Sequence, residues 1–499
     1  MMGTKVLAFA PMTGVSVEDL VPSDHFYRHL ESKLDLSFVR ELVSDRYSCI
    51  GRPSVDPVVF FKLQLVMFFE GIRSERLLIR VAADRLSIRW YLGYDLHEPL
   101  LDHSSLTKIR ECYGLDTFRR FFDEVVERCA GAGLVWGQEL YFDATKAEAN
   151  ASLDSVSPRF AVEAHLGELF AGQTVRAGDD EVPQPEPLPV DRPEDALNEL
   201  AEENAGRHDW IAEGGRQDRG ARRGHYQRIS DYEASRTDPD ASLMQRRGGG
   251  PHFGYHVHYV VDGGKARIIL QVLTTPSEVM ENQPMQDLLW RCRFRWKLTP
   301  KQVTGDTTYG TAENIAAIER ANIRAYVPLP DFDSRTPYFG KAEFVYDAAR
   351  DVYVCPQGDV LHRSGCIYQE RVIRYKADAA TCNPCPLKHR CTASPDGRQV
   401  RRNFDEVYLD RVRDYHRTEA YKRAMRKRAV WVEPLFAEAK DWHGLRRFRL
   451  RRLRRVNSEA LLVATGQNVK RLLSTRGWGR RDWPGGALGL RLTTVPSPS

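Results

Sequence analysis

The 499-residue chain has too few cysteines for a fold built on disulfides, and it has no hydrophobic run long enough to cross a bilayer. Its nine cysteines, an odd number, favour free thiols or a metal site in a reducing compartment. The longest apolar stretch, residues 58–69, is interrupted by Lys62 and Gln64 and is shorter than the roughly 20 residues of a membrane-spanning helix. Residues 1–14 lack the basic segment and apolar core of a secretory signal. We therefore expect a soluble, cytoplasmic protein.

Two common signatures of catalysis are also missing. The chain has no nucleophile elbow of the kind that serine-triad hydrolases use. The glycine-rich segment at 246–256 has no strand before it and no helix after it, as a phosphate-cradling loop requires. These absences argue against serine-triad chemistry and against a nucleotide-binding loop.

The distribution of charge is more informative than the mild net charge of +5. A chain of this length predicts two to four structural units. Residues 172–204 are acidic, rich in proline and poor in large apolar side chains, which predicts a flexible insertion. Arginines are concentrated near the other end of the chain, at Arg446, Arg447, Arg449, Arg451, Arg452, Arg454 and Arg455. The first segment repels phosphate and the second attracts it.

Residues 52–125 have the pattern of successive helices. Asp56, which precedes a proline, and Ser74 are typical N-caps of two of them, and Asp102 or Ser104 can cap a third. Short helices joined by tight turns, the last of them basic, fit a helix-turn-helix that contacts DNA. The alternative is a helical domain for dimerisation or packing.

From residue 138 the pattern becomes that of an α/β domain. A strand over 138–145 is followed, after the acidic segment, by a β-hairpin at 254–262 and 266–275. The pattern then predicts a helix at 282–296, a strand at 301–310, a helix at 311–321 and a strand at 323–329. His256 and His258 alternate on one strand, where packed or hydrogen-bonded histidines are more common than metal ligands.

Two carboxylates stand at the ends of predicted strands, Asp143 after QELYF and Asp306 after QVTG. Taken singly, each could be a turn former or a helix cap. A third candidate, Glu433, precedes Pro434, which favours the first turn of a helix and pushes Glu433 towards an extended or N-cap conformation. Lys440 follows two turns later on the same helix face. Carboxylates grouped in this way suit Mg²⁺ or Mn²⁺.

Four motifs in order carry a resemblance to a known family. They are GRPSVDPVVFFKL with DHSSLTKIR, then FDATKAEAN, GDTTYGTAEN and VEPLFAEAKDWHGLRRF. The chain resembles the DDE transposases of bacterial insertion sequences, and more narrowly the branch with a Tyr-Arg-Glu-Lys signature around its catalytic Glu. The resemblance covers roughly residues 15–475.

The resemblance implies an α/β catalytic domain with an RNase H-like mixed sheet and flanking helices, preceded by an all-α domain and carrying a Cys-rich insertion. Asp143, Asp306 and Glu433 would hold two Mg²⁺ or Mn²⁺ ions. These ions would activate water to cut one strand at the end of the element, and the 3′-hydroxyl would then attack target DNA. The implied partners are double-stranded DNA, both terminal inverted repeats and target, and further copies of the chain in a homodimer or larger assembly at the bacterial nucleoid.

The chain departs from the signature at one position. The spacing between the catalytic Glu and the Lys is kept, but the signature Arg would fall on Ala429. Arg428 or Arg426 can substitute, and Tyr421 matches the signature Tyr only loosely. We assign DNA binding to basic residues of this region, Lys440, Arg428, Arg446, Arg447 and Arg451; a solvated helix face is the alternative for the arginine run.

A cluster of cysteines precedes Glu433. Cys382, Cys385 and Cys391 have C-x2-C-x5-C spacing, and Cys355 or Cys366 can complete a four-thiolate zinc site. We predict structural zinc on Cys355, Cys382, Cys385 and Cys391, with free or oxidation-prone thiols as the alternative.

These expectations divide the chain into five parts. Residues 1–130 form a helical domain for DNA binding or oligomerisation, and residues 135–330 form the first part of the catalytic domain, with its flexible insertion at about 172–230. The Cys-rich insertion occupies 331–415, the rest of the catalytic domain 416–475, and a disordered tail 476–499. The function that we expect is that of an active transposase. Two alternatives remain open: a DNA-binding protein derived from a transposase, and a two-metal nuclease without joining activity.

Overall fold

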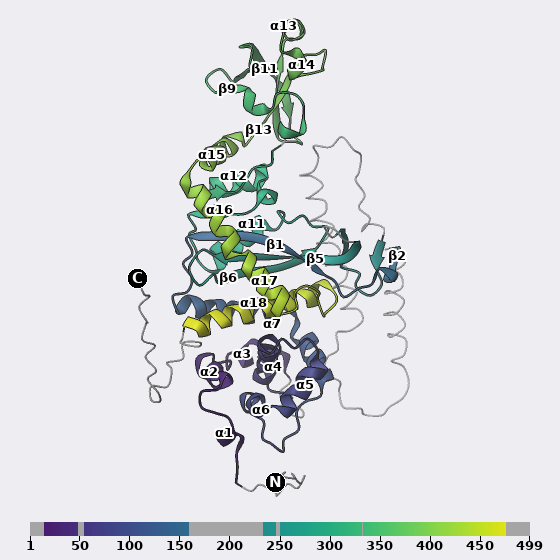
Figure 1. Ribbon diagram of the computed structural model, residues 1–499, viewed down its shortest axis with the longest axis vertical. Coiled ribbons are helices and arrows are strands. Elements are labelled where there is room, and N and C mark those ends of the chain that lie inside the picture. Colours follow the sequence, from purple (N-terminus) through teal and green to yellow (C-terminus); the bar gives the residue numbers. More distant parts are fainter. Residues whose placement is uncertain (1–13, 48–53, 159–232, 246–249, 332, 476–499) are drawn as a thin grey trace, which may run out of the picture.

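The structure is a computed structural model that describes most of the chain, namely residues 14–47, 54–158, 233–245, 250–331 and 333–475. The insertion predicted at about 172–230 and the tail predicted at 476–499 lie outside these residues. The molecule is elongated, with the N-terminal helices at one end, a mixed sheet in the middle and a small β unit at the other end (Figure 1). No helix in the described ranges is both long and apolar enough to span a membrane.

The N-terminal region is helical, as the sequence predicts. It contains α1 (Val17–Leu20), α2 (Phe26–Lys33), α3 (Val39–Leu42), α4 (Pro57–Phe69), α5 (Glu75–Asp84), α6 (Leu86–Leu92) and α7 (His103–Gly131). The predicted N-caps are in place: the side chains of Asp56, Ser74 and Asp102 accept hydrogen bonds from backbone N–H groups at the starts of α4, α5 and α7. Of the two candidates for the third cap, Asp102 is therefore the one used.

Helix α7 is longer than the short helix that the sequence predicts, but it is broken at Gly114. Gly114 has φ 67° and ψ 173°, a region of backbone space that is essentially restricted to glycine. A Cβ at this position would lie 2.5 Å from Nη2 of Arg454. The break therefore needs a residue without a side chain for two reasons, backbone conformation and the close approach of the Arg454 guanidinium.

We expect Gly114→Ala to destabilise the protein by about 1–3 kcal/mol, because alanine strains this backbone and displaces Arg454. Gly131→Ala is the matched control in the same helix, since a Cβ there meets nothing within 4 Å and its φ is not positive. The control should be neutral or slightly stabilising. Thermal unfolding of both variants tests this, and equal midpoints would contradict the special role of Gly114.

The central sheet is mixed. Its strands are β1 (Glu139–Glu148), β4 (Ser242–Gln245), β5 (Pro251–Asp262), β6 (Ile269–Pro276), β7 (Gln302–Thr304) and β8 (Arg324–Tyr326). Strand β1 pairs antiparallel with β5 and parallel with β7, β8 pairs parallel with β7, and β6 pairs antiparallel with β5. The predicted hairpin is thus confirmed as β5 and β6. A separate two-stranded ribbon joins β2 (Val156–Pro158) to β3 (Glu233–Ser235).

The strand predicted over 301–310 is wrong in its second half. Strand β7 ends at Thr304, and a short 3-10 helix begins at Thr307. The physical reason is Asp306, whose side chain accepts a hydrogen bond of 2.8 Å from the backbone N–H of Thr308 and so turns the chain out of the sheet. The helices α11 (Met285–Arg295) and α12 (Ala312–Arg320) are found where helices are predicted.

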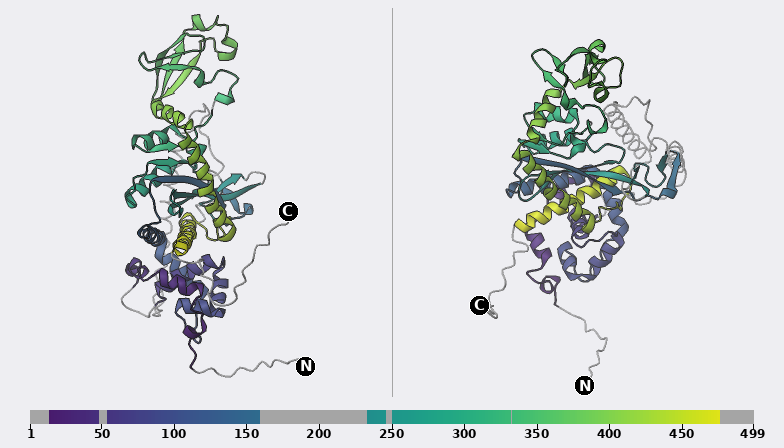
Figure 2. Two further views of the ribbon diagram at one scale, coloured as in Figure 1. Left: turned by 60° about the vertical axis from the view of Figure 1, so that its left-hand side comes forward. Right: turned by 45° about the horizontal axis from the view of Figure 1, so that its top comes forward.

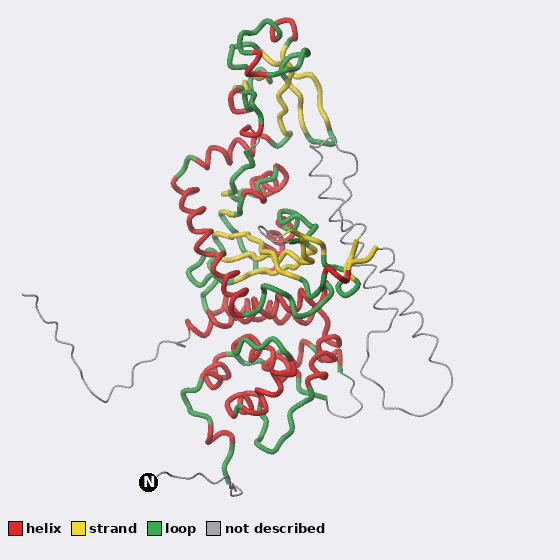
Figure 3. Tube along the Cα trace, turned by 45° about the vertical axis from the view of Figure 1, so that its right-hand side comes forward, coloured by secondary structure: helices red, strands yellow, loops and turns green. Residues whose placement is uncertain are grey.

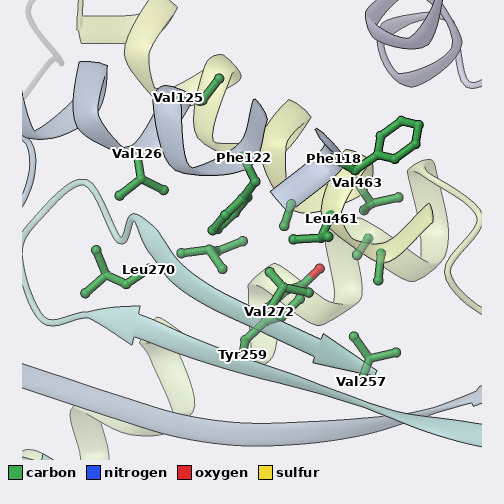
Figure 4. Close-up of a cluster of buried hydrophobic side chains, with 14 of the residues drawn as sticks. Phe118, Phe122, Val125, Val126, Val257, Tyr259, Leu270, Val272, Leu461 and Val463 are labelled. Atoms are coloured by element: carbon green, nitrogen blue, oxygen red, sulfur yellow. The ribbon is translucent and has the colours of Figure 1, made fainter. Parts of the chain in front are cut away.

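One face of the sheet is covered by α7 and by α18 (Leu453–Thr475). Figure 4 shows this layer of buried side chains, which come from α7, α18, β5 and β6: Phe118, Phe122, Val125, Val126, Leu461, Val463, Val257, Tyr259, Leu270 and Val272. The same hydrophobic core continues into α2–α6. The predicted boundary near residue 130 therefore lies within one continuous core, not between two.

Helix α18 also protects the edge of the sheet. The side-chain amides of Asn457 and Asn468 each donate to and accept from the β6 backbone, at Thr274 and Ile269, over 2.8–2.9 Å. An amide side chain presents the same donor and acceptor as a neighbouring strand. The two asparagines thus satisfy an edge that would otherwise be open to pairing with another chain.

The small unit at the far end of the molecule has its own core. It is an antiparallel sheet in the order β13-β12-β11-β10-β9, and Figure 3 shows its strands in yellow, away from the central sheet. Its elements are β9 (Val345–Asp347), β10 (Val352–Val354), β11 (Val360–Ile367), β12 (Val372–Ala377), α13 (Ala379–Cys382), α14 (Lys388–Cys391) and β13 (Gln399–Asn403). Three helices then return along the molecule, α15 (Glu406–His416), α16 (Glu419–Trp431) and α17 (Glu433–Trp442) (Figure 2).

Candidate active site

The three carboxylates singled out from the sequence lie around one arginine. Nη2 of Arg428 is 3.7 Å from Oδ1 of Asp143 and 3.6 Å from Oδ2 of Asp306. Nη1 of Arg428 is 3.7 Å from Oε1 of Glu433. Residues that are far apart in the chain therefore share one small region of space.

The sheet explains why the two aspartates are neighbours. Strands β1 and β7 run parallel, and their register places Tyr141 opposite Thr304. Two residues further along each chain come Asp143 and Asp306, which therefore lie side by side. Asp143 is still inside β1, opposite Tyr259 of β5, and its side chain is only 12% exposed.

Glu433 reaches the aspartates from a kink between two helices. Pro434 has no N–H to donate to the carbonyl of Val430 one turn earlier, and the guanidinium of Arg267 donates to that carbonyl instead, at 3.3 Å. Val432, between α16 and α17, keeps helical angles, and Glu433 is the first residue of α17. The expected extended or N-cap conformation of Glu433 is thus wrong, because α16 delivers the chain already in helical geometry.

Burial and the positive charge of Arg428 shift the pKa of Asp143 in opposite directions. Burial raises the pKa of its carboxyl to about 6, the nearby Arg428 opposes the rise, and the carboxylates of Asp306 and Glu433 add to it. Arg428 itself is 13% exposed. Its distances to the carboxylates are too long for hydrogen bonds, and its buried Nε has no hydrogen-bond partner within the described residues. The guanidinium is held by charge, and its N–H donors remain available to a ligand.

One acidic residue of this region was missed by sequence reasoning. Glu281 follows β6 in a loop, and burial raises the pKa of its carboxyl to about 7, with further contributions from Asp306 and Asp143. Its Oε1 lies 3.7 Å from Nε2 of His256. No strand end, helix cap or motif marks Glu281 in the sequence, so nothing local could have identified it.

The two strand histidines are packed and hydrogen-bonded. Nδ1 of His256 lies 3.1 Å from the carbonyl of Val279, and Nε2 of His258 lies 3.0 Å from Oγ1 of Thr275. Burial lowers the pKa of His256 to about 4 and that of His258 to about 3, so both rings are neutral at pH 7.

The arginine run after α17 is divided between surface and structure. Arg446, Arg447 and Arg451 are exposed, as DNA contacts require. Arg446 forms an ion pair with Asp441, and Nε of Arg451 donates to the carbonyl of Asn150. Other members of the run form ion pairs with acids of distant segments, Arg449 with Glu75, Arg452 with Asp240 and Arg455 with Glu111. Part of the basic run therefore joins the start of α18 to α5, α7 and the segment before β4.

The remaining signature positions lie on α16 and α17. Lys440 is half-buried in the last turn of α17, two turns from Glu433. Tyr421 packs its ring against His416 and Tyr326, with centroid distances of 4.5 and 6.0 Å. Tyr421 thus lies in an aromatic cluster at the start of α16.

The four cysteines predicted to bind zinc line one cavity of about 300 Å³ in the small β unit. Cys366 is not among its lining residues; its Sγ accepts a hydrogen bond from Arg363 at 3.3 Å. Cys355 is therefore the cysteine that lies with the C-x2-C-x5-C trio. Within the part of the chain that the structure describes, however, no three or more Cys, His, Asp or Glu side chains are arranged to hold a metal ion.

Comparisons with protein families match two separate parts of the chain. Residues 15–112 match a transposase domain family (DUF772), and residues 354–473 match a transposase DDE domain family. The second match includes Arg428, Glu433 and the four cysteines, whereas Asp143 and Asp306 lie between the matched segments. No curated protein and no solved structure matches the chain. Two transposase families thus match separate parts of one chain, in the order expected, and together they support a DDE transposase of the insertion-sequence type.

Proposed function

We propose that this transposase cuts DNA at the ends of its element and joins the freed 3′ ends to target DNA, with Asp143, Asp306 and Glu433 as the catalytic carboxylates. The observation that carries the proposal is the convergence of these three side chains within 3.7 Å of the same guanidinium. Three carboxylates around one positive charge would form a cation site once they close on an ion, and Arg428 supplies a positive charge at that place.

The donor set suits hard divalent cations. Carboxylate oxygens are the ligands that Mg²⁺ and Mn²⁺ prefer, and the side chain of Glu433, at 62% exposed, has room to move towards the aspartates. When bound, such ions would activate the attacking oxygen and stabilise the leaving oxygen of a phosphodiester. The proposal extends to an RNase H-like fold, supported by a sheet in which β1 has antiparallel neighbours on one side and parallel neighbours on the other.

Basic side chains around the carboxylates would position DNA. Arg428 can turn its free N–H groups from the carboxylates to a phosphate, for which a guanidinium is a well-matched donor. Lys440, two turns along α17, would hold a phosphate further from the reacting centre. The exposed Arg446, Arg447 and Arg451 would neutralise backbone phosphates of double-stranded DNA. An assembly of two or more copies would bring two element ends together.

The test uses the full-length protein, its own element ends, Mg²⁺ and a target duplex. Joined products support transposition. Binding without cleavage identifies a DNA-binding protein that has lost catalysis, and cleavage without joining identifies a nuclease. Asp306→Asn is the control: it should bind the element ends and leave them uncut, and persistent cleavage would show that the carboxylates are assigned wrongly.

We also retain structural zinc in the small β unit as a proposal, on Cys355, Cys382, Cys385 and Cys391. It is supported by the shared cavity and by the small core of the unit, which a metal would brace. We expect one zinc per chain in protein purified without chelator, and loss of that zinc in Cys382→Ser. Cys366→Ser, the control, should keep the metal. Protein with no zinc at all would refute this proposal and leave the catalytic one intact.

A further inference from the structure

One face of the small β unit is unusually basic. In β12 the side chains of Tyr375 and Ala377 point into the core of the unit, so Arg374 and Lys376 point to the opposite face, because side chains alternate along a strand. The strand register adds His362 of β11, opposite Lys376, and Arg401 of β13, opposite Arg374. We call this surface the outer face. Over β11–β13 its strand positions are Val360, His362, Ser364, Gly365, Ile367, Val372, Arg374, Lys376, Gln399, Arg401 and Asn403, all of them half-buried or exposed. Strands β10 and β9 continue the same face with Val352, Val354, Val345 and Asp347.

The outer face places like charges next to each other. Arg374 and Arg401 are direct cross-strand partners, an arrangement that destabilises a sheet unless an anion lies nearby. None of the β11–β13 positions on this face is Asp or Glu, and Asp347 lies on β9, at the opposite edge of the sheet from Arg401. Glu370, in the turn between β11 and β12, forms an ion pair with Arg401 at 2.7 Å. Within the described residues, no ion pair reaches Arg374 or Lys376.

The backbone makes room for Arg374 on this face. The register between β11 and β12 shifts at Arg363 and Gly365, and this bulge brings Gly365 opposite Arg374. Gly365 has φ +148°, and a Cβ there would lie 3.3 Å from Nη2 of Arg374. The guanidinium therefore lies over a position without a side chain. Its Nε is buried and has no hydrogen-bond partner in the described part of the chain.

We propose that the outer face binds the phosphate backbone of duplex DNA, at a place separate from the three carboxylates. The proposal rests on the proposed function, since it gives this transposase a second contact with its substrate. A phosphate would supply the anion that Arg374 and Lys376 lack within the described residues. A protein partner fits less well, because protein interfaces are built around buried aromatic and apolar anchors, and the β11–β13 part of the outer face, where the basic residues lie, has no aromatic side chain and only Val360, Ile367 and Val372 as large apolar ones.

The experiment compares two double variants of the full-length protein. Arg374→Gln/Lys376→Gln removes two charges from the outer face. Arg350→Gln/Arg363→Gln removes two charges of the same β unit that lie off this face, Arg350 in the turn between β9 and β10 and Arg363 in β11, with side chains 61% and 51% exposed. Binding to a duplex of fixed length is measured at several salt concentrations, next to wild type and Asp306→Asn.

We expect the outer-face variant to bind roughly tenfold or more weakly at about 0.1 M salt and to lower the slope of log K against log salt by about 2, the loss of two phosphate contacts. Its thermal midpoint should not fall, because the variant relieves repulsion between neighbouring charges. The control should keep the wild-type slope. An unchanged slope in the outer-face variant, or an equal loss in the control, overturns the inference. Cleavage by Asp306→Asn would overturn the proposed function instead, so the two failures are distinguishable.

Discussion

Asp143→Asn is expected to lower strand cleavage by more than about 100-fold and, at the same time, to raise the stability of the metal-free protein. Loss of activity follows from the position of Asp143, since removing even an outer partner of a metal site typically costs about 10- to 100-fold. The gain in stability follows from burial: the side chain is 12% exposed and must carry a charge at neutral pH. Asparagine has the same shape without the charge.

The size of the stability gain in Asp143→Asn depends on pH. Because burial raises the pKa of Asp143 from 3.8 to about 6, the folded protein holds this proton more tightly than the unfolded chain does. The stabilisation from that proton is complete below pH 3.8 and is lost as pH rises through 6. The Asp143→Asn variant avoids the loss, so its advantage grows between pH 4 and 6 and then levels off at about 2–3 kcal/mol.

Thermal unfolding in EDTA at pH 4, 5 and 7.5 measures this advantage. Asp396→Asn is the control, because Asp396 is exposed in a turn of the small β unit, and its variant should match wild type at every pH. A second series with Mg²⁺ should stabilise wild type and leave Asp143→Asn unchanged. An Asp143→Asn protein that is less stable than wild type at pH 7.5 would mean that Arg428 outweighs the effect of burial.

Local sequence signals predicted the elements whose structure depends on residues close together in the chain. The N-caps Asp56, Ser74 and Asp102 and the β5–β6 hairpin were found because one short segment contains all the information. The two aspartates could be proposed because each directly follows, or ends, an apolar strand. Their meeting with Glu433 came from a resemblance, since no local pattern relates residues separated by an insertion and a whole β unit.

Features that depend on distant partners could not be predicted. The arginine run resembles a DNA-binding surface, but the pairing of Arg449 with Glu75 joins residues 374 positions apart. Glu281 carries no local signal, and its raised pKa arises only when burial and the two aspartates come together. The sequence also left Arg428 and Arg426 as alternatives, because the spacing of the signature fits neither residue.

Arg428 is expected to stabilise the metal-free protein and also to compete with divalent cations for the three carboxylates. The Arg428→Gln variant separates these two effects. Without the guanidinium, the three carboxylates that surround it repel one another without compensation, so the metal-free variant should be less stable than wild type at pH 7.5. The same loss removes a positive charge with which any divalent cation must compete. Mg²⁺ should therefore raise the thermal midpoint of Arg428→Gln by more than it raises that of wild type.

Cleavage by the variant should nevertheless fall by about 100-fold, because a charge-assisted contact to phosphate contributes roughly 1.5–3 kcal/mol. Arg426→Gln is the matched control: Arg426 lies two residues earlier on α16 and is exposed. It should show wild-type stability, a wild-type response to Mg²⁺ and at most a small loss of DNA affinity. If Arg426→Gln lost cleavage while Arg428→Gln kept it, Arg426 would hold the signature position, and Arg428 would serve only to neutralise the carboxylates before metal binds.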